Sequence, residues 1–231
     1  MNRLLWKLIP KTQRELLLER LPVIDRQVVN KTLSGKNQFP QAFDKLECLF
    51  IHVPKCAGSS VAHALFGGTP TGHMPLYWYE KLFNERYLNY FKFGFVRDPL
   101  QRALSAYNYL QRSMESRDKT AHSLVTKYPT FDAFVDNWLS PENITRQIHF
   151  APQYYFLQNA MGSIDVDFIG RQENLAADFR TLCLHLHVKT DLQHINRSLR
   201  SKNPDSQACS AASRRKIRDV YARDYELFSY E

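Results

Sequence analysis

The chain has 231 residues, a length that fits one α/β domain around a single hydrophobic core. Hydrophobic residues make up 44% of it, which argues against intrinsic disorder, and a mean hydropathy of −0.44 argues against an integral membrane protein. The formal net charge of +8 indicates an anionic partner: a nucleotide, an acidic glycan, a nucleic acid or an anionic lipid surface.

The cysteines and the N-terminus bear on the cellular compartment. The four cysteines include no CxxC pair, so we expect free, reduced thiols rather than disulfides. They are Cys48, Cys56, Cys183 and Cys209. The apolar run at the N-terminus is interrupted by Lys7 and is too short for a signal peptide or a membrane span. We therefore expect a cytoplasmic protein.

Residues 1–45 mix apolar pairs with basic residues, a pattern typical of amphipathic helices, and Pro10 is expected to break the helical run. We predict that this N-terminal segment packs on the surface of a domain formed by residues 46–231. A peripheral membrane contact through the segment stays open as the alternative.

From residue 47 onward, strands and helices are predicted to alternate. The predicted strands are 47–53, 90–96 and 166–170, and the predicted helices are 59–66, 97–113, 131–139, 174–186 and 214–228. Ser59 is expected to cap the first of these helices, and Pro99 to stand in the first turn of the second. Segments 77–89 and 112–128 carry no readable code and are expected to be substrate-selecting loops. The alternation implies one α/β domain with a central parallel sheet flanked by helices.

The first predicted strand leads into the stretch FIHVPKCAGSS, residues 50–60. A strand, a turn of small residues and a helix in succession offer backbone N–H groups to a phosphate. In a Walker A loop the lysine follows the second glycine, whereas here Lys55 precedes Gly58 and the first glycine is missing. The sequence therefore predicts an anion-binding loop that differs from the loop of a nucleoside triphosphatase.

A second anion site is predicted in FVRDPLQRALSAY, residues 95–107. Arg97 follows the strand and offers a planar fork of donors to a phosphate, and Ser105 can add a hydroxyl. Because both turns follow strands of one parallel sheet, they should lie at the same edge and hold two separate phosphates. Arg102 either reaches the second phosphate or lies on a solvated helix face; the sequence does not decide between these.

With these two motifs the sequence resembles the carbohydrate-type branch of the sulfotransferases that use 3'-phosphoadenosine-5'-phosphosulfate (PAPS). The first motif is similar to that family's 5'-phosphosulfate loop and the second to its 3'-phosphate motif. Four further blocks follow in the family's order: GHM, HFAPQYYFL, VDFIGRQENLAADF and VYARDYELFSY. The resemblance runs from about Glu47 to Tyr230 and implies a P-loop-like sulfotransferase fold. Cys56 stands where threonine is common.

The resemblance also implies a reaction, the in-line transfer of a sulfonate from PAPS to a hydroxyl of a carbohydrate-type acceptor. Lys55 is expected to neutralise the departing phosphate oxygen, and His73 to remove the acceptor proton. His149 is the runner-up base and is expected, together with Gln153, to position the acceptor. The residues expected to bind PAPS are Lys55, Cys56, Ala57, Gly58, Ser59, Ser60, Arg97 and Ser105. No metal is predicted, because the chain contains no HExxH or CxxC spacing.

Two hypotheses from other classes stay open. A P-loop-like kinase would need a different lysine position and a Walker B strand, and a non-catalytic basic module that binds glycans would leave the paired phosphate motifs unexplained. The expected partner is a glycan or another hydroxylated acceptor, and the positive net charge favours an acidic one. No nucleic acid is expected. The sequence assigns neither the acceptor nor the oligomeric state.

Overall fold

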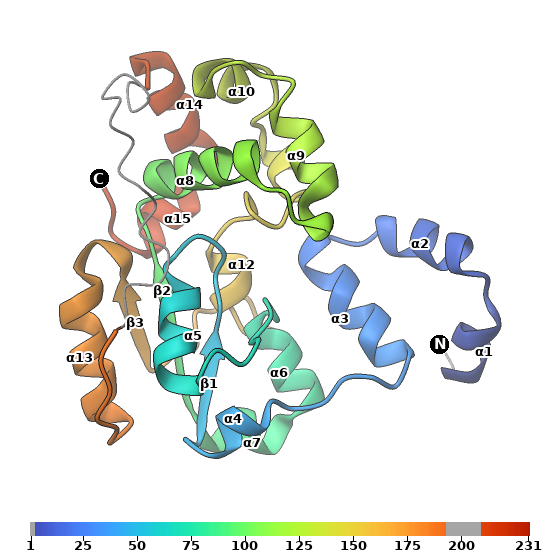
Figure 1. The fold of residues 1–231 in the computed structure, drawn as a ribbon, viewed down its shortest axis with the longest axis vertical. Coiled ribbons are helices and arrows are strands. Elements are labelled where there is room, and N and C mark those ends of the chain that lie inside the picture. Colours follow the sequence, from blue (N-terminus) through green and yellow to red (C-terminus); the bar gives the residue numbers. More distant parts are fainter. Residues whose placement is uncertain (1–2, 193–208) are drawn as a thin grey trace.

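The computed structural model describes residues 3–192 and 209–231, with a parallel sheet at the centre (Figure 1). Within those residues the sheet has three strands in the order β1-β2-β3, and both neighbouring pairs are parallel. The strands are β1 (Cys48–Ile51), β2 (Phe91–Val96) and β3 (Phe168–Arg171). Each lies inside a predicted strand region or extends one residue past it. The predicted α/β fold with a parallel sheet flanked by helices is confirmed.

Helices cover both faces of the sheet, and the alternation of side chains along the strands decides which helix packs where. Phe50 of β1 lies opposite Phe93 of β2, and their rings stack at 5.0 Å on the face that Phe66 of α5 (Gly58–Phe66) contacts. On the opposite face, a Cβ at Gly94 would lie 2.7 Å from the Leu157 side chain of α12 (Tyr154–Leu157). Glycine at this position therefore lets α12 approach the strand closely.

Two hydrophobic clusters divide the molecule, and we call the parts around them the sheet half and the helical half (Figure 1). Besides the strands, α5 and α12, the sheet half contains α6 (Leu76–Leu82), α7 (Asn84–Asn89), η2 (Gln172–Asn174) and α13 (Leu175–His185). The helical half contains α8 (Pro99–Arg112), η1 (Ser116–Asp118), α9 (Lys119–Val125), α10 (Phe131–Asn137), α11 (Pro141–Ile144), α14 (Ala211–Val220) and α15 (Ala222–Leu227).

Three polar side chains with no exposed surface connect the two halves: Arg102, Gln153 and Asp224. We call them the polar seam. Arg102 of α8 donates hydrogen bonds to the carbonyl oxygens of His149 and Ala151, at 3.2 and 2.8 Å. Asp224 of α15 accepts the backbone N–H of Gln153 at 2.9 Å. The expected solvated helix face is wrong for Arg102, which is fully buried and donates to backbone carbonyls, although its Nε has no partner in the described residues. The expected contact with the second phosphate stays a prediction.

The N-terminal segment forms four helices: α1 (Arg3–Leu8), α2 (Lys11–Glu19), α3 (Val23–Leu33) and α4 (Gln41–Asp44). The predicted break at Pro10 is confirmed. Trp6 of α1 is buried, and Ile24 of α3 joins the hydrophobic cluster around the sheet. Asp25 of α3 accepts hydrogen bonds from the side chains of Tyr77 and Trp78. In α2 no residue is buried. None of the helices described in the structure is long and apolar enough to cross a membrane.

Several local expectations differ from the structure. Helix α5 begins at Gly58 after Ala57, and no side chain caps it, so the expected Ser59 cap is wrong. Segments 77–89 and 112–128 are not loops, since α6, α7 and α9 occupy most of them. The predicted C-terminal helix is interrupted at Tyr221 and forms α14 and α15. All four cysteines are free and buried, as predicted.

Candidate active site

The loop between β1 and α5 has the backbone conformation of an anion-binding turn. Lys55 and Ala57 both adopt left-handed conformations, with φ of 69° and 62°, and Ala57 leads directly into the helical Gly58. Alternation of left-handed and right-handed residues turns successive N–H groups toward one side. Because no side chain caps α5, the N–H groups of its first turn can serve the same ligand.

Gly58 is needed for a reason that the sequence did not reveal. A Cβ on this residue would lie 2.1 Å from Cδ2 of the His52 ring, which is packed against the loop. His52 stacks on Phe50, and its Nδ1 lies 3.0 Å from the hydroxyl of Thr71. The missing side chain at Gly58 therefore makes room for His52, in addition to leaving the backbone accessible.

Cys56 points into the protein and not toward a ligand. Its Sγ donates to Oε1 of Gln153 at 3.2 Å, and burial raises its pKa to about 12, so the thiol is neutral at physiological pH. Any contact that Cys56 makes with an anion must come through its backbone. This explains why cysteine can replace threonine at the position.

Gln153 holds the two predicted anion loops together. Its Oε1 accepts the backbone N–H of Arg97 at 2.9 Å, and its Nε2 donates to the carbonyl oxygen of Arg97 at 2.8 Å. The Cys56 thiol donates to the same Oε1 atom. The Gln153 side-chain amide therefore connects the two loops, although Gln153 and Cys56 are 97 positions apart in the chain. The side chain has no exposed surface, and its amide is engaged with Cys56 and Arg97, so this structure gives it a positioning role. The expected acceptor contact of Gln153 stays a prediction.

Arg97 lies at the carboxyl end of β2 with its guanidinium incompletely paired. Its Nε is buried and has no hydrogen-bond partner in the described part of the chain, where Arg97 also forms no ion pair with an acid. The neighbouring acids are engaged elsewhere: Asp98 accepts the N–H of Gln101, and Glu173 accepts the N–H of Asp98. The side chain as a whole is only partly buried, so a guanidinium that is unpaired at Nε and faces no acid is available to an anionic ligand. Ser105 lies half-buried on α8, and no hydrogen bond of its hydroxyl is found among residues 3–192 and 209–231.

His73 has the tautomer that a general base requires. Its Nδ1 lies 2.8 Å from the backbone carbonyl oxygen of His52, and because a carbonyl only accepts, Nδ1 carries the proton and Nε2 keeps its lone pair. Burial lowers the pKa of His73 below its ordinary value, so the ring is neutral at physiological pH. The rings of His73 and His52 are 4.4 Å apart.

His149 lies beside Asp118, with 3.7 Å between Nε2 and Oδ1. Burial lowers the pKa of His149 to about 4, so the pair is not an ion pair at neutral pH. Its Nδ1 is buried and has no hydrogen-bond partner in the part of the chain described. The expected acceptor role of His149 stays a prediction.

Two further residues complete the cluster: Tyr109, which was expected to pack near the nucleotide base or in the core, and Asp118, to which the sequence analysis gave no role. The Lys55 Nζ lies 3.7 Å from the centroid of the Tyr109 ring, and the Tyr109 hydroxyl donates to Asp118 at 2.6 Å. Asp118 is 4% exposed and also accepts from the Ser113 hydroxyl at 2.9 Å. No sequence pattern marks either residue, because Asp118 lies in a short polar turn within a segment expected to be a loop.

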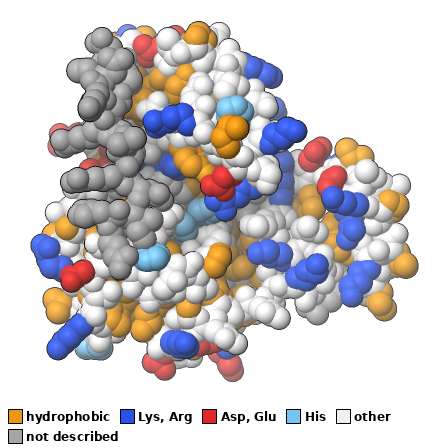
Figure 2. Space-filling model, viewed as in Figure 1, with side chains coloured by type: hydrophobic (Ala, Val, Ile, Leu, Met, Phe, Trp, Pro, Cys, Tyr) orange, Lys and Arg blue, Asp and Glu red, His pale blue; other side chains and the backbone are white. Residues whose placement is uncertain are grey.

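Lys and Arg side chains are spread over the face drawn in Figure 2, and some of them lie near its centre beside acidic and histidine side chains. Burial, and then the neighbouring Arg97, lower the pKa of Lys55 to about 8. Burial also lowers the pKa of Arg97. These two partly buried cations raise the local positive potential, which an anionic ligand would neutralise.

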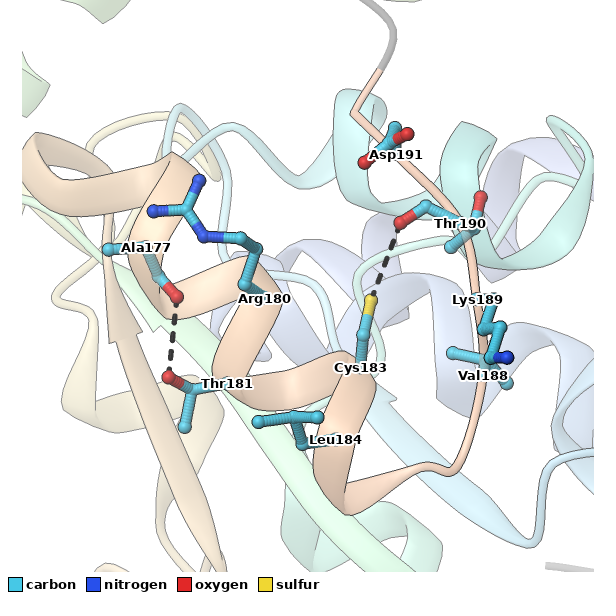
Figure 3. Close-up of a pocket in the computed structure, with 9 residues that line it drawn as sticks. All are labelled: Ala177, Arg180, Thr181, Cys183, Leu184, Val188, Lys189, Thr190 and Asp191. Carbon is cyan, nitrogen blue, oxygen red and sulfur yellow. Dashed lines mark hydrogen bonds between the residues drawn. The ribbon is translucent and has the colours of Figure 1, made fainter.

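A separate pocket of 720 Å³ lies between α13 and the chain that follows it (Figure 3). Its lining includes Arg180, Cys183, Lys189 and Thr190, and no residue of the two anion loops contributes to it. We therefore do not assign it to the reaction. No group of three or more His, Cys, Asp or Glu side chains suited to a metal is found in the described residues.

The comparisons with known proteins agree with this geometry. The model of the sulfotransferase family matches residues 42–231, and the chain belongs to that family. Carbohydrate sulfotransferase 14 from Homo sapiens is 29% identical over 166 residues, and the protein of the same name from Mus musculus is 28% identical over the same length. Each alignment covers 63% of this chain and 43% of the relative, so this chain matches less than half the length of these relatives.

Proposed function

We propose that the protein transfers a sulfonate group from PAPS to a hydroxyl of a carbohydrate acceptor. The observation that carries the proposal is the incompletely paired, partly buried Arg97 at the end of β2, beside an uncapped loop that carries Lys55. Two neighbouring anion sites suit a nucleotide with two separate phosphate groups. Family membership supports the same reaction class.

The residues of the two loops fit PAPS, which supplies a sulfonate already activated by its bond to a phosphate. The backbone of residues 55–60, with the hydroxyls of Ser59 and Ser60, would hold the 5'-phosphosulfate. Arg97 and Ser105 would hold the 3'-phosphate. Gln153 fixes the backbone of Arg97 relative to Cys56, so both sites keep one spacing.

Two side chains of the protein have separate roles in the proposed reaction. His73 accepts the acceptor's hydroxyl proton at Nε2 while the new oxygen–sulfur bond forms, since Nδ1 is already occupied by the His52 carbonyl. Lys55 places its ammonium where the oxygen of the departing phosphate gains negative charge as its bond to sulfur breaks. This charge develops during the reaction, so the lysine contributes most to the transition state.

The acceptor class is inferred from the relatives. Both are named carbohydrate sulfotransferases, and the net charge of +8 suits an acidic glycan. The test is incubation of the protein with sulfur-labelled PAPS and a panel of neutral glycans, acidic glycans, lipids and phenols. Label on a glycan supports the proposal, and label on a lipid or phenol alone would overturn the acceptor class.

The nucleotide assignment has its own test, calorimetric titration of PAP, AMP and ATP. The wild-type protein should bind PAP more tightly than AMP by roughly two to four powers of ten, since AMP leaves Arg97 without its anion. Arg97→Ala should remove most of this preference, whereas Arg86→Ala should keep it, because Arg86 pairs with Asp44 elsewhere. Preference for ATP would favour the kinase hypothesis. Heparin retention without PAP affinity would favour a glycan-binding module.

A further inference from the structure

Lys55 has no anionic partner in contact with it in the described structure, yet its ammonium occupies one place, the face of the Tyr109 ring. We propose that Tyr109 and Asp118 are positioning residues for Lys55. The Tyr109 ring seats the ammonium, and the Asp118 carboxylate, bound to the Tyr109 hydroxyl, keeps that ammonium protonated. The role assigned to Lys55 rests on the proposed function.

The Lys55 ammonium lies against the face of the Tyr109 ring. At 3.7 Å from the ring centroid, the Lys55 Nζ is well inside the distance at which an ammonium and an aromatic face attract each other. A lysine side chain has a flexible four-carbon stem and otherwise samples many positions. Tyr109 stands on α8, in the helical half, so it fixes a side chain that comes from the sheet half.

Lys55 is surrounded by a small set of titratable and charged groups. The groups that act on it are Arg97 of the second loop, Arg112 of α8, Cys56 beside it and Asp118 of η1. His73 and His149 also lie within electrostatic range, but both are neutral at physiological pH. Cys56 is a neutral thiol as well. Asp118 is therefore the one anion in this set, and it opposes the two arginines.

Asp118 is built to stay ionised although it is buried. Burial by itself would raise its pKa, but hydrogen bonds from Tyr109 and Ser113, together with the nearby charge of Arg117, hold the pKa below its ordinary value. Such a carboxylate has no direct contact with Lys55 and acts through the Tyr109 ring and through space. Removing its charge should make Lys55 lose its proton at a lower pH.

The chain offers a matched control for this arrangement. Lys92 lies 5.4 Å from the centroid of the Tyr87 ring, and the Tyr87 hydroxyl donates to Asp165. This second lysine–tyrosine–aspartate set lies in the sheet half, where β2 begins. Asp165→Asn therefore makes the same chemical change as Asp118→Asn in a set that does not include Lys55.

The experiment measures the protonation of Lys55 directly. Wild type, Asp118→Asn and Asp165→Asn are treated with trace acetic anhydride between pH 6 and 10, and mass spectrometry gives the acetylated fraction of the Lys55 peptide. In Asp118→Asn the Lys55 titration should move to lower pH, with at least about a threefold rise in labelling at pH 7, the equivalent of half a pKa unit. Asp165→Asn should match the wild type.

Turnover supplies a second readout. In Asp118→Asn the rate should fall at pH 8 with the KM for PAPS within about twofold, and lowering the pH should restore part of the rate, which a purely structural defect would not allow. If Asp118→Asn does not fold by circular dichroism, Tyr109→Leu and Tyr109→Phe replace it, since the first removes the ring and the second keeps it. Tyr109→Leu should then label Lys55 more heavily than Tyr109→Phe.

The outcomes separate the two proposals. An unchanged Lys55 titration in Asp118→Asn, or equal labelling in the two Tyr109 variants when these are needed, overturns the positioning proposal even if the protein transfers sulfonate. A shifted titration in a protein that binds no PAP overturns the proposed function and leaves the Lys55–Tyr109–Asp118 arrangement in place.

Discussion

The sheet half and the helical half contribute to the site in different ways. The sheet half supplies Lys55 and Arg97, which lie in motifs that follow β1 and β2, and His73, which lies in the GHM block after α5. The helical half supplies Tyr109 and Asp118, which lie outside these motifs, and His149, which opens the block HFAPQYYFL. The comparison teaches that reacting groups can stand in continuous motifs, whereas the groups that orient them come together only by packing.

The largest expected effect is on the chemistry of the sheet half. His73→Ala should lower turnover by roughly 10²–10⁴-fold and leave PAP binding nearly unchanged, because the base acts on the acceptor proton. The matched control is His185→Ala, since His185 packs against Phe91 and Phe168 at the opposite end of the strands. Steady-state kinetics and calorimetry measure both quantities. Equal turnover in the two variants would remove His73 as the base, and a loss in His149→Ala alone would transfer the role there.

The next effect is on the polar seam that joins the halves. Gln153→Ala leaves the partly buried N–H and carbonyl of Arg97 without partners, and each such group costs about 1–3 kcal/mol, so the unfolding free energy should drop by roughly 2–6 kcal/mol. PAP affinity should fall with it. Chemical denaturation is the measurement, and Gln101→Ala is the control because Gln101 lies exposed on α8. Normal stability together with a weakened KM for the acceptor would support the acceptor role for Gln153.

A smaller effect is expected at Gly58, inside the sheet half. Gly58→Ala forces the His52 ring to move, and overpacking of this kind costs about 1–3 kcal/mol. The double variant Gly58→Ala with His52→Ser should regain part of that stability, since the smaller side chain leaves room for the Cβ. A double-mutant cycle by thermal denaturation measures the coupling. Additive effects would mean that the ring and the glycine do not compete for space.

The smallest effect is the pH profile, which reports on both halves. His73 must be neutral, and burial lowers its pKa, so turnover should rise with pH through a value below the ordinary 6.5. Lys55 must be charged, and burial followed by Arg97 lowers its pKa, so turnover should decline as pH rises through about 8. A rate profile between pH 5 and 10 checks both limbs. An alkaline limb near the ordinary lysine value would show that Lys55 is not desolvated in the working enzyme.

Features of the site that are formed by neighbouring residues could be predicted from the sequence, whereas features formed by residues far apart in the chain could not. The anion loop with Lys55 and Gly58 is predictable, because one strand, one turn and one helix in succession create it. The expected cap at Ser59 was wrong because Ala57 turns the chain through a left-handed conformation one residue earlier. The helices within 77–89 and 112–128 were missed because they are short, and short helices form through packing and not through strong intrinsic preference.

The sequence by itself determined the three parallel strands, the helices that follow them and the family resemblance, and it marked two candidate phosphate-binding motifs. Tertiary structure alone decided that Arg102 is fully buried, that Gln153 connects Cys56 with Arg97, and that Asp118 faces the same cluster as Lys55. The physical reason is that the burial and pairing of a polar side chain depend on residues far away in the chain. Cys56 and Gln153 are 97 positions apart, and no local pattern records that they share a hydrogen bond.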